Sequence, residues 1–157
     1  MTVAFELNGA PVMLDLPPET PLVHALRDGL GLFGTRWGCG AEACGACMVL
    51  LDGQPVPSCT LVLDAVAGRR VRSVEGLGTP TAPHPLQTAF LEEQAGQCGY
   101  CLSGILVSAA ALLERIPDPD ETAVRTALDG NLCRCGAHNR IIRAVLRAAA
   151  SMRGVPA

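Results

Sequence analysis

Eight cysteines, arranged as two groups of four, are the side chains of this 157-residue chain whose types and spacing could do chemistry. The first group is Cys39, Cys44, Cys47 and Cys59, spaced C-x4-C-x2-C-x11-C. The second group is Cys98, Cys101, Cys133 and Cys135, spaced C-x2-C-x31-C-x-C. Four thiols are enough to hold one metal centre, and no cysteine is left over. The sequence therefore predicts two metal centres, each held by four thiolates.

The first group opens with the C-x4-C-x2-C spacing that holds plant-type [2Fe–2S] clusters, which predicts one-electron transfer through two iron–sulfur centres. Two other kinds of site use several cysteines. Disulfide frameworks are typical of small secreted chains, but Met1–Leu16 has neither the basic start nor the long apolar run of a signal peptide. Zinc prefers separated C-x2-4-C knuckles, often with histidine, and His138 is the only histidine near a cysteine group. We therefore favour clusters, and we expect a cytoplasmic chain unless a partner carries it across a membrane.

Composition limits the classes of partner. Hydrophobic residues make up 49% of the chain and aromatic residues 3%, so aliphatic side chains must fill the core. No apolar stretch approaches the ~20 residues of a membrane span, and we expect no direct membrane insertion. The net charge of −3, with mixed signs and no basic stripe, argues against nucleic-acid binding. The sequence also lacks a dinucleotide-binding glycine motif and any acid–base or nucleophile constellation, so we expect no catalytic residue in this chain.

Two clusters would add buried negative charge, which needs hydrogen-bond donors nearby. Gly38, Gly40 and Gly45 let backbone N–H groups approach the first group of thiols closely. Arg36 and Arg134 also lie beside cysteines in the sequence. Each arginine could be a solvated surface residue or could face a cluster, and the sequence leaves both interpretations open.

Residues 1–76 have the pattern of an α+β domain. The expected elements are strands at Val3–Leu7 and Val12–Leu16, a helix from Pro21 to Gly29 or Gly31, and strands at Met48–Leu51 and Arg70–Val74. Asn8-Gly9 and Asp52-Gly53 are turn signals, and Thr20 is the expected N-cap of the helix. Two strands, a helix, a cysteine loop and further strands predict a β-grasp, ferredoxin-like layout.

Residues 77–157 have a helical pattern that follows a connector rich in glycine and proline, Glu75–Pro85. The expected helices are Leu86–Gln94, Ser103–Ile116, a third capped by Asp120 and closed by Gly130, and a fourth capped by His138 or Asn139. Their apolar stripes predict the core of a four-helix bundle. We expect His24, in the first domain's helix, and His84, in the connector, to be structural.

The four cysteines of the second group lie in two loops of this bundle. Cys98 and Cys101 fall between its first and second helices, and Cys133 and Cys135 fall between its third and fourth. Antiparallel helices would bring both loops to the same end of the bundle. The four thiols can then converge, which favours one metal centre over two independent dithiols.

Three runs of sequence carry a family resemblance: Gly38–Cys47 (GCGAEACGAC), Gln97–Cys101 (QCGYC) and Asn131–Gly136 (NLCRCG). Together they resemble the small iron–sulfur subunit of the molybdenum hydroxylases, the family of xanthine oxidase, aldehyde oxidoreductase and carbon monoxide dehydrogenase. The resemblance includes Asp52-Gly53 and Val74–Leu77, and it covers nearly the whole chain.

The resemblance implies a plant-ferredoxin-like domain and a helical domain, each with one [2Fe–2S] cluster. It also implies a large partner subunit that holds molybdenum through molybdopterin cytosine dinucleotide. In such enzymes electrons pass from molybdenum to the helical-domain cluster, then to the ferredoxin-like cluster, then to an FAD or cytochrome c acceptor. By the same resemblance Gln97 contacts the pterin and Cys135 is the cluster ligand nearest to it. The other interpretation of Gln97 is a loop-capping amide.

Some residues depart from the common family pattern, and these are Leu102-Ser103-Gly104, Gly136-Ala137-His138, Ala41 and Ala43. In these positions the chain is more similar to isoquinoline and nicotinate dehydrogenase small subunits. His138 is expected to be a cap or surface residue and not a metal ligand. Two other classes of function stay open: a free two-cluster ferredoxin or redox sensor, and a zinc-stabilised interaction module.

Overall fold

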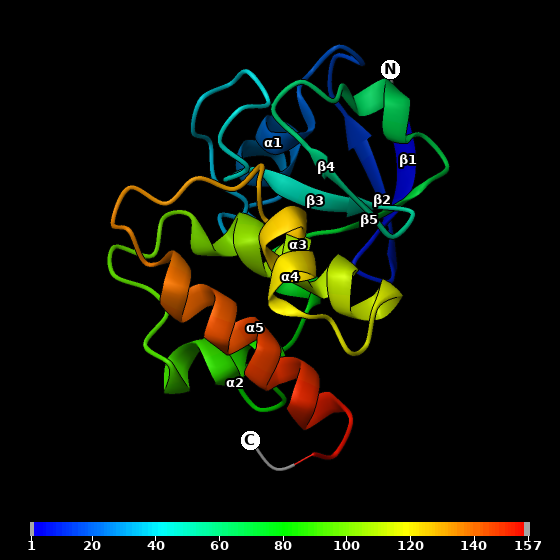
Figure 1. Ribbon diagram of the computed structural model, residues 1–157. Helices are drawn as coiled ribbons and strands as arrows, with labels where there is room; N and C mark the ends of the chain where they lie inside the picture. The colour runs from blue at the N-terminus through cyan, green and yellow to red at the C-terminus, as the bar shows by residue number, and fades with distance from the viewer. Residues whose placement is uncertain (1, 156–157) are drawn as a thin grey trace.

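The computed structural model describes residues 2–155, and its first half is built on a five-stranded sheet (Figure 1). The strands are β1 (Thr2–Leu7), β2 (Ala10–Asp15), β3 (Met48–Leu51), β4 (Gln54–Pro57) and β5 (Arg70–Arg72). Their order across the sheet is β2-β1-β5-β3-β4. β1 and β5 run parallel, and the other neighbouring strands are antiparallel. This sheet forms the ferredoxin-like half of the α+β fold that the sequence predicts.

The sheet follows from alternation in the sequence. Val3, Phe5 and Leu7 of β1 are buried, and the residues between them are exposed. In the turn after β1, Asn8 (φ 52°) and Gly9 (φ 84°) both adopt positive φ, as the tight two-residue hairpin turn requires. The Asp52-Gly53 turn between β3 and β4 has the same geometry. The predicted hairpin signals are therefore confirmed at both places.

The helical segment after β2 differs from the prediction. It begins one residue later, as α1 (Leu22–His24), and continues as the π-helical turn η1 (Ala25–Gly29). Pro21 is the N-cap residue and no side chain caps the helix, so Thr20 does not have the predicted role. The backbone instead bonds to the segment after Cys59, through Leu22 N–H to Leu61 O (2.7 Å). The N–H group of Leu22 therefore bonds to a distant carbonyl oxygen and not to a side-chain cap next to it in the chain.

The described residues of the second half form four helices: α2 (Pro85–Glu92), α3 (Leu102–Arg115), α4 (Glu121–Ala127) and α5 (His138–Met152). Two short 3-10 turns precede them, η2 (Leu63–Val66) and η3 (Val74–Gly76). Asp120 caps α4 as predicted, because its Oδ1 accepts from Ala123 N (2.7 Å). His84 caps α2: its Nδ1 accepts from Leu86 N (3.1 Å), and Gln87 bonds back to His84 N (2.8 Å). α5 begins at His138 without a side-chain cap, so neither predicted cap residue has that role.

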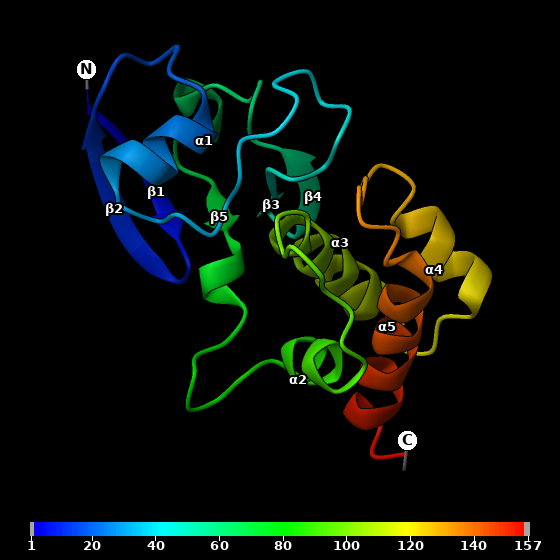
Figure 2. The ribbon, with the colours of Figure 1, turned by 90° about the vertical axis from the view of Figure 1, so that its left-hand side faces the viewer.

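Helix α3 is the element that joins the two halves. It packs against β3 on one side and against α2 and α4 on the other, and α5 packs against α2 and α4 (Figure 2). The sheet and the helices keep separate apolar cores. The ion pair of Arg72 with Glu114 ties β5 to α3. This packing fixes the position of the helical domain's loops relative to the sheet domain.

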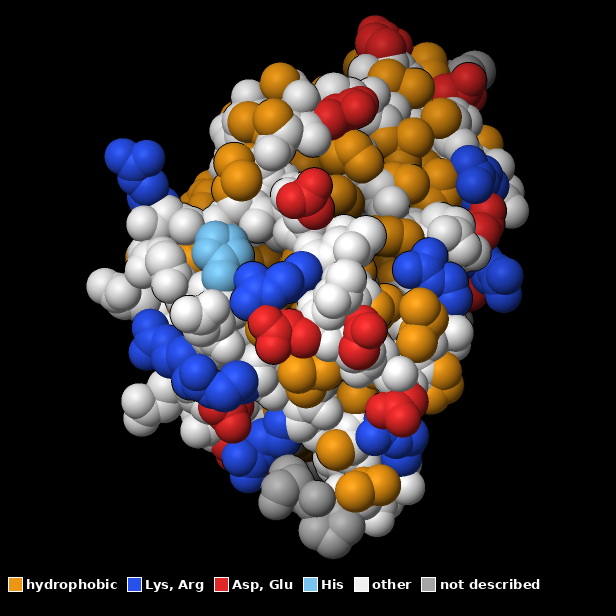
Figure 3. Space-filling view, viewed as in Figure 1, with side chains coloured by type: hydrophobic (Ala, Val, Ile, Leu, Met, Phe, Trp, Pro, Cys, Tyr) orange, Lys and Arg blue, Asp and Glu red, His pale blue; other side chains and the backbone are white. Residues whose placement is uncertain are grey.

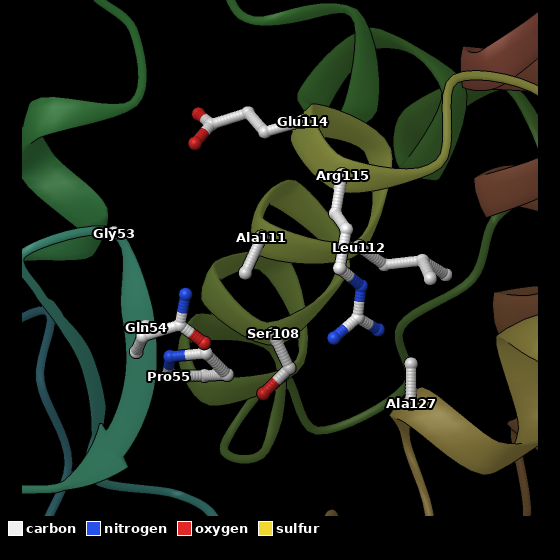
Figure 4. A pocket seen from close by; sticks show the side chains of 9 residues that line it. All are labelled: Gly53, Gln54, Pro55, Ser108, Ala111, Leu112, Glu114, Arg115 and Ala127. Atoms are coloured by element: carbon white, nitrogen blue, oxygen red, sulfur yellow. The ribbon is translucent and has the colours of Figure 1, made fainter.

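A pocket of about 400 Å³ lies between the β3–β4 turn and α3 (Figure 4). Its lining includes Gln54, Ser108 and Arg115 but no cysteine or histidine. On the face drawn in Figure 3, acidic and basic side chains are interspersed without a continuous basic area. No helix within residues 2–155 is both long and apolar enough to cross a membrane. The chemistry must therefore be sought at the two cysteine groups.

Candidate metal centres

The first cysteine group comes from two segments. Cys39, Cys44 and Cys47 lie in the irregular loop before β3, and Cys59 follows the end of β4. Its exposure falls along the chain: Cys39 is exposed, Cys44 is half-buried, and Cys47 and Cys59 are buried. Arg27 holds the start of the loop, because its Nη1 donates to the carbonyl oxygens of Phe33 (2.9 Å) and Thr35 (2.8 Å). Arg36 N donates to Ala46 O (3.3 Å), which closes the loop on itself.

Backbone N–H groups of this loop point at sulfur. Ala41 N and Ala43 N lie 3.3 and 3.2 Å from the Sγ of Cys39, and Cys39 N lies 3.3 Å from the Sγ of Cys44. The loop reaches this shape through positive φ at Gly40 (68°). The N–H groups of Ala41 and Ala43 lower the pKa of Cys39 to about 7. The loop therefore favours the thiolate, which is the form that binds metal.

The other two thiols of the first group are inside the domain. Cys47 and Cys59 form a small buried cluster with Val23 of α1. The hydroxyl of Ser58 donates to Cys47 O (2.7 Å), which fixes this corner. Burial, followed by the contact with the Cys59 thiol, raises the pKa of Cys47 to about 11. A cation nearby would favour deprotonation of Cys47, and a metal centre would supply one.

The second group converges as the helix topology predicts. Cys98, Cys101, Cys133 and Cys135 line one small hollow between the α2–α3 loop and the α4–α5 loop. Gln97 and Ala137 also contribute to the lining of this hollow. The 31 residues between the two cysteine pairs are bridged because α3 and α4 return the chain to the same end of the bundle. Four convergent thiols are the donor set that a small thiolate-bound centre requires.

The thiols of the second group differ in ionisation. The backbone N–H of Tyr100, then the thiol of Cys135, lower the pKa of Cys98. Burial, then the contact with Cys133, raises the pKa of Cys101 to about 12. Burial opposes the ionisation of Cys133 as well, but N–H groups of its own loop lower its pKa overall. The second site thus combines one exposed thiol, Cys98, with three half-buried thiols, whereas the first site has two buried thiols.

Within each site the thiols contact one another as two pairs. The pairs are Cys39 with Cys44, Cys47 with Cys59, Cys98 with Cys135, and Cys101 with Cys133. All eight are free thiols, so disulfides are not formed. Within residues 2–155 no three His, Cys, Asp or Glu side chains gather as a single-ion site would require. A [2Fe–2S] cluster has two irons and is held by four thiolates, so two pairs of thiols per site match one cluster.

Glycines in the first cysteine loop allow close approaches that a side chain would block. A Cβ at Gly38 would lie 2.6 Å from the Sγ of Cys44, closer than real contacts allow. Gly45 (φ 71°) lies so close to the carbonyl oxygen of Gly130 that a side chain there would overlap it. The first site therefore has four thiols with backbone N–H donors around them. These residues fit a bound cluster, as expected from the sequence.

The two cysteine sites touch across the domain boundary. Leu132 N donates to Cys44 O (2.9 Å), and Asn131 Nδ2 donates to Gly45 O (3.1 Å). The loop before α5 therefore lies directly beside the loop before β3, which the orange and cyan segments show in Figure 1. On another side the hydroxyl of Tyr100 donates to Trp37 O. Four of these bridging residues were missed as functional candidates: Trp37, Tyr100, Asn131 and Leu132. All but Trp37 lie inside the three runs that carry the family resemblance.

The remaining candidates divide between the sites and the surface. Gln97 is exposed and lies at the rim of the second hollow, next to Cys98. Arg36 is half-buried, whereas Arg134 is exposed, so the two arginines near the cysteines are not equivalent. His138 is exposed at the start of α5. His24 pairs with Asp28 (3.3 Å) and its ring lies 4.8 Å from the ring of Trp37, so it has a structural contact.

Comparison with protein families gives two matches that together span most of the chain. A 2Fe-2S iron-sulfur cluster binding domain matches residues 5–73, and a [2Fe-2S] binding domain matches residues 73–146. Each match contains one of the two cysteine groups.

Characterised relatives are similar over nearly their full length. The chain is 49% identical over 152 residues to a nicotinate dehydrogenase subunit of Pseudomonas putida, covering 97% of each chain. It is 47% identical over 148 residues to the alpha subunit of isoquinoline 1-oxidoreductase of Brevundimonas diminuta, covering 94% of this chain and 97% of that one.

Solved structures show the same arrangement. A chain of quinoline 2-oxidoreductase from Pseudomonas putida 86 superposes with a TM-score of 0.91 at 36% identity, covering 99% of this chain and 98% of that one. The aldehyde oxidoreductase of Desulfovibrio desulfuricans superposes with a TM-score of 0.95 at 40% identity, but this chain spans only 17% of that larger one. The chain belongs to the small [2Fe–2S] subunits of the molybdenum hydroxylase family, the electron-transfer subunits of these oxidoreductases.

Proposed function

We propose that this chain carries electrons from a large molybdopterin-binding subunit to an external acceptor, through one [2Fe–2S] cluster in each domain. The observation that carries the proposal is the contact of two four-thiol sites across the domain boundary. The proposed ligands are Cys39, Cys44, Cys47 and Cys59 in the first site, and Cys98, Cys101, Cys133 and Cys135 in the second. A [2Fe–2S] cluster takes up and releases one electron at a time when it is bound.

The protein's own contribution is the route between the sites. Cys133 is bonded covalently to Leu132, whose N–H donates to the carbonyl oxygen of Cys44. A ligand of one site is therefore connected to a ligand of the other by a few covalent bonds and one hydrogen bond. Asn131, which is 3% exposed, keeps the two cysteine loops next to each other through its bond to Gly45 O.

The end of the route that receives electrons is the helical domain. Gln97 lies at the rim of the thiol hollow and also lines a second, larger hollow with Leu102, Leu106 and Arg140. Leu91, on the same rim, is 79% exposed, and it extends the apolar lining that Leu102 and Leu106 give this hollow. We place the large subunit here, with Gln97 contacting its molybdopterin cytosine dinucleotide and Cys135 as the ligand nearest to it.

The end that delivers electrons is the exposed side of the first site. Cys39 is the most exposed thiol of its group, and Phe33 (61% exposed) and Trp37 (39% exposed) lie in the same loop. An acceptor that docks on this loop would come within a short distance of the cluster. A cytochrome c or an FAD-bearing subunit or domain would serve as this acceptor.

Affinity purification from the native host tests the proposal. The tagged chain is expected to bring down a large subunit in a fixed ratio, with molybdenum in the eluate and about four irons per small chain. A chain that is recovered alone, fully loaded with iron and free of molybdenum, would contradict the partner and support a free-standing ferredoxin or redox sensor.

A further inference from the structure

Three side chains in the described part of the chain have a buried polar atom without a hydrogen-bond partner. The atoms are Thr35 Oγ1, Arg36 Nε and Ser103 Oγ. Thr35 and Arg36 precede the first cysteine group, and Ser103 follows Cys101 by two residues. Buried donors in folded proteins almost always have an acceptor. All three residues lie within four positions of a cysteine in the sequence, and the sulfur of a bound cluster would be an acceptor that is not a protein atom.

Arg36 belongs to both sites. Its backbone N–H donates to Ala46 O (3.3 Å), inside the loop of the first group. Its guanidinium carbon lies 5.3 Å from the centre of the Tyr100 ring, and Tyr100 sits between Cys98 and Cys101 of the second group. The hydroxyl of Tyr100 is held by Trp37 O, so the ring is fixed beneath the guanidinium. A cationic side chain of the sheet domain thus lies over a ring that is placed between two proposed ligands of the helical domain's site.

Building on the proposed electron-transfer function, we propose that Arg36 raises the reduction potential of the cluster in the helical domain. The guanidinium is always charged. A reduced cluster carries one more negative charge than an oxidised one, so a nearby cation favours the reduced state. The buried Nε also lies where water screens the interaction little. Arg36 is therefore a positioning residue of the first domain that makes the second cluster a better electron acceptor.

Arg134 provides the matched control. It lies between two proposed ligands, Cys133 and Cys135, and so is closer in sequence to the cluster than Arg36 is. Its side chain is exposed, however, and water and salt weaken the effect of an exposed charge. If burial decides the effect, removing Arg36 shifts the potential more than removing Arg134 does.

The test is an EPR-monitored redox titration of the cluster-loaded chain as wild type, Arg36→Gln, Arg36→Lys and Arg134→Gln. The signal that disappears in a Cys135→Ala variant identifies the helical-domain cluster. In Arg36→Gln we expect its reduced-to-oxidised ratio at a fixed solution potential to fall about tenfold, a shift of about 59 mV for one electron. Arg36→Lys should recover most of the shift, and Arg134→Gln should move the potential less than Arg36→Gln does.

An unshifted potential in a fully loaded Arg36→Gln chain would overturn the inference, as would an equal or larger shift in Arg134→Gln. If Arg36→Gln does not load, Tyr100→Leu removes the ring beneath the guanidinium and should shift the same signal in the same direction; no shift there also overturns it. A wild-type chain that loads iron but shows no two separate signals would instead contradict the proposed function. The two failures are therefore distinguishable.

Discussion

The carbonyl oxygen of Cys44 accepts a hydrogen bond of 2.9 Å from the backbone N–H of Leu132, and this bond joins the two cysteine loops. The residues on either side of Leu132 make the contact specific. Asn131 bonds to Gly45 O, and Cys133 follows as a proposed ligand. Two domains with separate cores thus meet where their cysteines lie, and the mechanism depends on how closely they stay together.

Gly104→Ala should separate the domains. A Cβ at Gly104 would overlap the carbonyl oxygen of Gly45, so α3 would have to move away from the first site. We expect a loss of stability of about 1–3 kcal/mol, as for overpacked cores, although alanine favours the helix. Thermal unfolding of the loaded chain measures this. Gly130→Ala is the control, because nothing lies within 4 Å of its added Cβ; equal melting temperatures for the two variants would refute the tight contact.

Asn131→Ala should weaken the same junction from the other side. Asn131 is 3% exposed and its amide donates to Gly45 O (3.1 Å), so truncation leaves that carbonyl with only the longer bond from Met48 N (3.4 Å), at a cost of about 1 kcal/mol. Electron exchange between the two clusters should also slow, because the path through Leu132 loses its support. Asn139→Ala, at an exposed position of α5, should change neither property. Unchanged unfolding and unchanged exchange in Asn131→Ala would show that the junction does not depend on this amide.

Cys135→Ala should remove one cluster and spare the other. The two cores are separate, so the first site should load normally while the iron content falls from about four to about two per chain. Cys44→Ala is the reciprocal variant and should remove the other signal. Iron analysis with EPR checks both variants. Loss of both signals in Cys135→Ala would mean that the two sites do not assemble independently.

His84 makes stability depend on pH. Burial, then the charge of Arg72, lowers the pKa of His84 below its ordinary value of about 6.5. A lowered pKa means that the unfolded chain binds more protons, so stability rises with pH in this range. The stability that neutral His84 contributes is therefore complete above its pKa in the unfolded chain. It is lost as pH falls through its lower pKa in the folded chain. Protonation also removes the Nδ1 acceptor that caps α2 through Leu86 N.

His84→Asn separates this effect from the rest of the chain, since asparagine can cap a helix without titrating. Between about pH 7 and pH 5 the wild type should lose stability relative to the variant, by about 1 kcal/mol for a lost cap. Melting temperatures of both proteins across this range give the comparison. Parallel pH profiles would exclude His84 as the source.

Features that depend on neighbouring residues in the chain were predicted more completely from the sequence than features that depend on long-range contacts. The alternation in β1 and the Asn8-Gly9 turn were sufficient for the first hairpin, because both act between neighbours in the chain. The convergence of the second cysteine group followed from helix order alone. The cap at Thr20 was wrong because the backbone of Leu22 pairs with Leu61, thirty-nine residues away.

The contact between the two domains could not be predicted from the sequence for the same reason. Gly45 and Gly104 have no periodic signal that would bring them together, and their contact depends on how α3 packs on β3. The two arginines near the cysteines were indistinguishable in sequence. Only the structure separates half-buried Arg36, against Tyr100, from exposed Arg134.

The most direct test of electron transfer through two clusters is an EPR spectrum of the gently purified, dithionite-reduced chain, recorded with its iron and zinc content. We predict a red-brown protein with about four irons per chain and two distinguishable [2Fe–2S] signals. Because Cys44 and Leu132 join the sites, magnetic interaction between the two reduced clusters should broaden or split these signals at low temperature. An anaerobically purified protein that is colourless, rich in zinc and EPR-silent would contradict electron transfer and leave a structural module.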